Sequence, residues 1–74
     1  MVLVFNPDHP FTLREQQILY FAAQGLSNKE IADHLVVSEQ TVKTHLSHML
    51  TKSLRANRTS LVVYGFESGI LQKR

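Results

Sequence analysis

The 74 residues of this chain suffice for one domain with a small core, so a buried active-site cavity is not expected. The absence of cysteine excludes a disulfide framework, a thiol nucleophile and a zinc-thiolate finger, and no apolar run approaches the ~20 residues of a membrane span. The formal net charge is only +2, but residues 40–66 contain four cations and no acid, a distribution suited to a polyanionic partner.

The first ten residues differ in character from the rest of the chain. The apolar start, Met1 to Phe5, has no basic region before it and does not predict a signal peptide, so we expect a cytoplasmic protein. Residues 1–10 contain both prolines and show no helical period. They are predicted to form an irregular N-terminal arm, and residues 11–74 the folded domain.

Two capping boxes predict the first two helices. Thr12 and Glu15 form the first box, in which the hydroxyl and the carboxylate each satisfy a backbone amide of the other residue. Gly25 supplies the left-handed residue that ends this helix. Ser27 and Glu30 repeat the box, so a second, short helix is predicted to begin one residue after Ser27.

Ser38 is a third N-cap and opens the longest predicted helix, which covers about residues 39–53. Its apolar stripe consists of Val42, Leu46, Met49 and Leu50. Asn57 or Thr59 can cap a fourth helix, which Gly69 ends. Because no stretch alternates for long enough to predict a strand, the fold class is all-α.

The second and third helices have the layout of a helix-turn-helix. About three residues join them, and the small Ala32 on the inner face of the second helix lets the two cross closely. From the residues alone, a plain three-helix bundle with similar caps is the alternative.

A long series of residues at regular spacing extends this pattern over most of the chain. These residues are Phe11-Thr12-Leu13-Arg14-Glu15, Ala23-Gln24-Gly25-Leu26-Ser27-Asn28-Lys29-Glu30-Ile31-Ala32, Leu35, Ser38-Glu39-Gln40-Thr41-Val42-Lys43-Thr44-His45, Lys52, Asn57-Arg58-Thr59 and Gly69-Ile70-Leu71. With them, residues 11–71 resemble the LuxR/GerE-type helix-turn-helix family. That family occurs at the C-terminus of many bacterial response regulators and quorum-sensing activators, and as free-standing regulators.

The resemblance implies a four-helix (tetrahelical) domain with its helix-turn-helix unit at residues 27–46. It implies sequence-specific binding of double-stranded DNA by a transcription regulator, with the helix of about 39–53 in the major groove. The fourth helix would form a homodimer on a two-fold or direct-repeat site. No catalysis, cofactor, metal or membrane is implied; RNA polymerase is a candidate partner, and the bound protein would lie on the nucleoid.

Five positions depart from the family pattern. Ser53-Leu54 stands where the family has Leu-Gly, so the left-handed glycine expected after the third helix is missing and Ser53 falls on the apolar side. Gln17 replaces a glutamate, while Leu61 and Gly65 replace alanines. We therefore expect the fourth helix to pack differently.

With its apolar stripe inward, the third helix presents Gln40, Thr44 and Ser47 outward and Lys43 on the flank. In the family, the positions that match Lys43, Thr44 and Ser47 meet base edges, and we expect Lys43 to donate to guanine. Side chains with chemistry suited to phosphate oxygens are Asn28, Lys29, Ser38, Thr41 and Lys52. The alternative for each is an ordinary solvated surface residue.

The fourth helix carries the candidate dimer contact. With Leu61 inward, its side chains Val63, Tyr64 and Phe66 lie partly outward, and exposed apolar groups on so small a domain favour a partner subunit.

Three other interpretations of the chain are a metal site, a protein-interaction module and an enzyme. His45 and His48 have metal-ligand spacing on one helix, but no cysteine or nearby carboxylate completes a site, so we expect a packed, hydrogen-bonded His45. A protein-interaction module that does not bind DNA is the alternative function. An enzyme is the third and weakest alternative, because no nucleophile is paired with a base.

Overall fold

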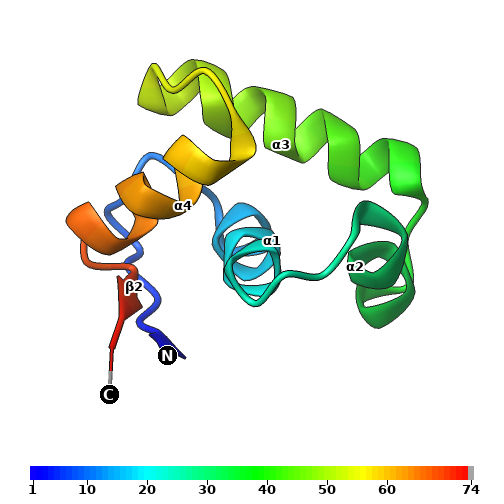
Figure 1. The fold of residues 1–74 in the computed structure, drawn as a ribbon, viewed down its shortest axis with the longest axis horizontal. Helices are drawn as coiled ribbons and strands as arrows, with labels where there is room; N and C mark the ends of the chain where they lie inside the picture. Colours follow the sequence, from blue (N-terminus) through cyan, green and yellow to red (C-terminus); the bar gives the residue numbers. More distant parts are fainter. Residues whose placement is uncertain (74) are drawn as a thin grey trace.

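A computed structural model describes residues 1–73; residue 74, the last of the predicted domain, lies outside the described residues. The elements in chain order are β1 (Val2–Leu3), α1 (Leu13–Ala23), α2 (Asn28–Leu35), α3 (Glu39–Ser53), α4 (Arg58–Glu67) and β2 (Leu71–Gln72). In Figure 1, α3 spans the top of the molecule above α1 and α2, and α4 leads back to the N-terminal arm. The four-helix, all-α prediction is confirmed.

Both predicted capping boxes are present and start their helices. The Thr12 hydroxyl accepts from the Glu15 amide at 3.2 Å, and the Glu15 carboxylate accepts from the Thr12 amide at 2.9 Å. The Ser27 hydroxyl accepts from the Glu30 amide at 3.2 Å, and the Glu30 carboxylate accepts in return at 2.8 Å. These four bonds satisfy amides that a helix leaves unpaired at its N-terminus.

The caps of the two later helices are also resolved. Ser38 caps α3, as predicted, by accepting from the Thr41 amide at 3.1 Å. Of the two caps considered for α4, Asn57 is the one used, because its side chain accepts from the Ser60 amide at 2.8 Å.

Two helices end on apolar residues in the left-handed conformation. Val36 follows α2 and Leu54 follows α3, each with φ of +57°, a region that non-glycine residues rarely adopt. Leu54 therefore takes the conformation of the glycine that the family has at this position. Its side chain is 92% exposed and that of Val36 is 90% exposed. The hydroxyl of Ser53 donates to the Met49 carbonyl at 2.8 Å. The polar side chain on the apolar side of α3 thus has a backbone hydrogen-bond partner, at a position where the family has leucine.

All four helices contribute to one core. Its buried apolar residues are Phe11, Ile18, Leu19, Ala22, Ile31, Ala32, Val42, Met49, Leu61, Ile70 and Leu71. Gly65 of α4 faces this core, where a Cβ would lie 2.7 Å from Leu71 Cδ1 and 2.9 Å from Leu19 Cδ2. The glycine at a position where the family favours alanine thus makes room for the side chain of Leu71.

The two ends of the chain form a short antiparallel pair. Val2 lies opposite Gln72, and Leu3 lies opposite Leu71. The buried Gln16 fastens the arm further along, since its amide donates to the Asn6 carbonyl at 2.9 Å and accepts from the Asn6 amide at 3.0 Å. The arm predicted to be irregular therefore contains a strand, which is too short to produce an alternating sequence pattern.

Candidate nucleic-acid interface

Helix α3 separates a buried face from an exposed polar face. Val42 and Met49 point inward and are fully buried. The residues predicted on the outward face and flank of this helix, Gln40, Lys43, Thr44 and Ser47, are all exposed. The structure therefore brings these four together on consecutive turns of one helix. The amide of Gln40 donates to the Thr44 hydroxyl at 3.4 Å, a weak bond that leaves both side chains open to other partners.

The predicted phosphate-binding residues lie at the N-termini of α2 and α3. Asn28 and Lys29 are the first two residues of α2, where Asn28 is half-buried and Lys29 is exposed. Ser38 and Thr41 lie at the start of α3 with their hydroxyl oxygens 3.0 Å apart. Backbone amides at helix N-termini attract anions, so both groups suit phosphate oxygens.

Lys52, the fifth phosphate candidate, is placed differently from the others. Its ammonium donates to Glu15 Oε1 at 2.7 Å and to the Pro10 carbonyl at 3.2 Å. Burial raises the pKa of the Glu15 carboxyl, but the bonds from Lys52 and from the Thr12 amide outweigh this effect, so the pKa is lowered. Lys52 thus neutralises the carboxylate of a side chain that is 3% exposed and holds α3 against α1.

His45 also faces Glu15 from α3. Its Nδ1 atom lies 3.9 Å from Glu15 Oε2 and is buried without a hydrogen-bond partner in the described part of the chain. The predicted packing of His45 is therefore present, but the predicted hydrogen bond is not. His48 is exposed, and residues 1–73 contain no group of three side chains that could hold a metal ion.

The three predicted dimer residues of α4 differ in exposure. Val63 is 47% exposed, whereas Tyr64 and Phe66 are half-buried against the core. The Tyr64 ring packs against the rings of His9 and Phe11, with centroids 5.8 and 5.6 Å apart, and the Arg55 guanidinium lies 5.4 Å from its centroid. Val63 is consequently the residue of this set most available to a second molecule.

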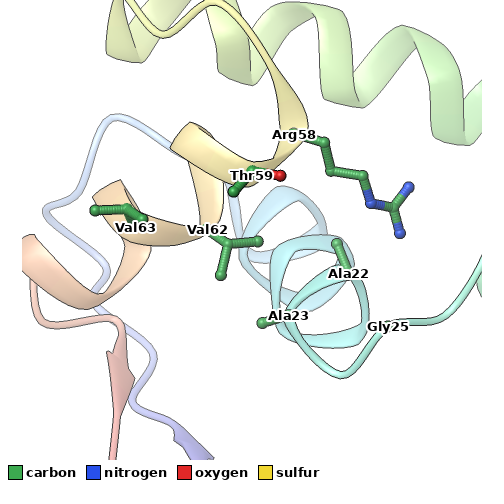
Figure 2. A pocket seen from close by; sticks show the side chains of 7 residues that line it. All are labelled: Ala22, Ala23, Gly25, Arg58, Thr59, Val62 and Val63. Carbon is green, nitrogen blue, oxygen red and sulfur yellow. The ribbon is translucent and has the colours of Figure 1, made fainter.

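An open groove of about 300 Å³ lies beside Val63, between α4 and the end of α1. Its lining residues are Ala22, Ala23, Gly25, Arg58, Thr59, Val62 and Val63. Figure 2 shows the Val62 side chain of α4 pointing toward the alanines of α1, whereas the Val63 side chain points away from them. The groove therefore offers an apolar surface next to an exposed apolar side chain.

Sequence reasoning assigned no role to Arg58. The structure places its guanidinium on the loop between α1 and α2, where Nη1 donates to Asn28 Oδ1 at 2.7 Å and Nη2 donates to the Leu26 carbonyl. One local signal points to such a contact, because an arginine in the first turn of a helix opposes the helix dipole unless another interaction compensates.

The chain is similar to several bacterial regulators. Residues 9–65 match the family described as bacterial regulatory proteins, luxR family. The chain is 48% identical over 63 residues to the uncharacterized transcriptional regulatory protein YxjL of Bacillus subtilis, covering 85% of this chain and 29% of that protein. It is 43% identical over 61 residues to the response regulator protein VraR of Staphylococcus aureus, covering 82% of this chain and 29% of that protein.

A solved structure supports the same relationship. The response regulator ChrA of a heme-sensing two-component system matches 89% of this chain with a TM-score of 0.81 and 38% identity. The match covers 33% of that structure, so the chain spans about a third of the length of these relatives. No helix within residues 1–73 is long and apolar enough to cross a membrane. By its sequence and its fold, this chain belongs to the luxR family of bacterial regulatory proteins, a family of helix-turn-helix DNA-binding transcription regulators.

Proposed function

We propose that this chain binds double-stranded DNA in a sequence-specific manner, with α3 lying in the major groove. The observation that carries this proposal is the division of α3 into a buried apolar face and an exposed face with Gln40, Lys43, Thr44 and Ser47. A helix of 15 residues is about 22 Å long, and the major groove, about 12 Å wide, admits a helix of this kind.

Lys43 has the chemistry to read a base. Its side chain is exposed and makes no ion pair with any described residue, so its ammonium is free to donate to guanine O6 or N7. The Thr44 methyl suits the methyl group of thymine, and the Gln40 amide suits adenine. The recognition face thus offers both polar and apolar contacts to base edges.

The proposed phosphate contacts flank this face. Asn28 and Lys29 at the start of α2, and Ser38 and Thr41 at the start of α3, would bind backbone oxygens and orient the domain on the duplex. Lys52 could bind phosphate only in competition with Glu15 and Pro10, so we assign its main role to holding α3 in place.

We further propose that two copies bind DNA as a dimer through α4. The support is the exposure of Val63 and the apolar groove next to it, with Tyr64 and Phe66 at the edge of the contact. A second copy would bury Val63 and the groove residues next to it.

Fluorescence anisotropy on a labelled 20-base-pair duplex of random sequence, measured between 50 and 200 mM salt, tests the proposal. DNA binding releases counterions, so the logarithm of affinity should fall linearly with the logarithm of salt concentration. Selection of bound sequences from a random pool should then yield a defined half-site. Absence of salt-dependent binding would favour the alternative, a protein-interaction module.

A further inference from the structure

Arg58 connects two parts of the molecule that are distant in sequence. It is the first residue of α4, and its guanidinium donates both to the Leu26 carbonyl, in the loop before α2, and to Asn28 Oδ1, 30 residues away in sequence. Figure 2 shows the side chain extending away from α4 towards the loop that follows Gly25. The start of α4 is thereby tied to the start of α2.

Local rules do not favour an arginine at this position. The N-terminal end of a helix carries a partial positive charge, and the first turn of α4 contains no acidic residue that could offset a cation. Arg58 also makes no ion pair with any described carboxylate. The contacts with Leu26 and Asn28 are therefore the interactions that compensate for placing the cation there.

The chemistry of the guanidinium decides how the Asn28 amide is turned. Arginine has only donors, so it can hold the asparagine side chain only through the oxygen Oδ1. The Nδ2 group must then point away from Arg58. No residue among 1–73 accepts a hydrogen bond from Nδ2, which leaves its two N–H donors available at the N-terminus of α2.

We propose that Arg58 is a positioning residue for DNA binding: it orients the Asn28 amide so that Nδ2 donates to a DNA phosphate. The inference rests on the proposed function, since Asn28 was assigned there as a phosphate contact. It also links α4, the proposed dimer helix, directly to the phosphate contact of α2.

A double-mutant cycle on the 74-residue chain tests the proposal. Affinity for a random 20-base-pair duplex is measured for wild type, Asn28→Ala, Arg58→Met and the double variant, with folding checked by circular dichroism. Each single variant should lose about tenfold in affinity, the size of a hydrogen bond to a charged group. In the Asn28→Ala background, Arg58→Met should cost less than about twofold more, because the contact it orients is already gone.

Two controls separate positioning from other roles. Arg55 also lies near α4 but pairs with Glu67, so any effect of Arg55→Met should be the same with and without Asn28→Ala. The logarithmic salt slope should be unchanged by Arg58→Met, because a positioning residue neutralises no phosphate itself; a direct contact would reduce the slope by about one per subunit. Should Arg58→Met fail to fold, Arg58→Lys replaces it in the cycle, since lysine lacks the planar guanidinium fork with which Nη1 and Nη2 reach Asn28 Oδ1 and the Leu26 carbonyl.

The outcomes separate this inference from the proposed function. If wild-type protein shows no salt-dependent binding, the proposed function itself is wrong. If wild type binds but Asn28→Ala has no effect, or the two losses multiply, or the salt slope falls with Arg58→Met, the positioning role is wrong and DNA binding stands. The positioning role is supported if the two losses of affinity do not multiply in the double variant and the salt slope is unchanged by Arg58→Met.

Discussion

Replacement of Leu54 by glycine should stabilise the protein. Leu54 has a φ of +57°, where its Cβ crowds the backbone, and only glycine adopts this region without strain. Because the side chain is 92% exposed, its removal sacrifices almost no packing. The substitution therefore measures the effect of backbone strain at the end of α3 on the free energy of unfolding.

The expected gain is the difference between two effects. A left-handed conformation costs an L-residue about 1–2 kcal/mol, which glycine would relieve. Against this, glycine makes the unfolded chain more flexible, at a cost of about 0.4–1 kcal/mol. The free energy of unfolding should thus rise by about 0.5–1 kcal/mol, and a domain of this size should melt roughly 2–8 °C higher.

Urea unfolding followed by circular dichroism measures this difference. Leu54→Ala is the matched control, because it removes the exposed isobutyl group but keeps the Cβ that causes the strain. It should leave the free energy of unfolding nearly unchanged. If Leu54→Gly destabilises the protein, or if Leu54→Ala stabilises it equally, the strain argument is wrong.

Three further predictions concern the ion pair below α3, the base-reading face and the dimer. Lys52→Met should lower the free energy of unfolding by about 2 kcal/mol, because it leaves the buried Glu15 carboxylate without its cation. The pKa of Glu15 is lower in the folded than in the unfolded protein, so the stability that its carboxylate contributes is present above about pH 4.3 and is lost as the pH falls through the folded pKa. Urea unfolding at pH 3–7 should show this loss of stability in wild type. An equal loss in Glu15→Gln would contradict the assignment to Glu15. Lys43→Met should weaken binding to a selected site about tenfold more than binding to random duplex, whereas Lys29→Met should weaken both alike. Competition anisotropy measures both affinities. Equal losses on the two DNAs for Lys43→Met would mean that Lys43 contacts phosphate and not a base. Val63→Asp should prevent dimers on a full site in sedimentation while half-site affinity is kept, and unchanged cooperative binding would place the interface elsewhere.

The helix starts were predictable because each depends on a few neighbouring residues. The hydroxyls of Thr12, Ser27 and Ser38 reach an amide only three residues away, so the cap forms in almost the same way wherever the helix packs. The exposed face of α3 was predictable for a similar reason. Once Val42 and Met49 point inward, the helical period places Thr44 and Ser47 outward.

The partners of the long cationic side chains were not predictable in this way. Lys52 and Arg58 have long flexible side chains that suit phosphate, carboxylate or carbonyl oxygens equally well. The packing of α3 and α4 brought them to Glu15 and Asn28, which lie 37 and 30 residues away in sequence. A local pattern can indicate that such a side chain needs a partner, but it does not identify a partner at that separation.

The amino-acid sequence alone therefore determined the helices, their caps and the polar face of α3, since these follow from hydrogen bonds and periodicity within one or two turns. The tertiary structure decided the left-handed backbone of Leu54, the space that Gly65 leaves for Leu71 and the pairing of the chain ends. Local propensity opposes or ignores each of these features. They arise because four helices and both termini must close on one small core, and the shared packing outweighs the preferences of single residues.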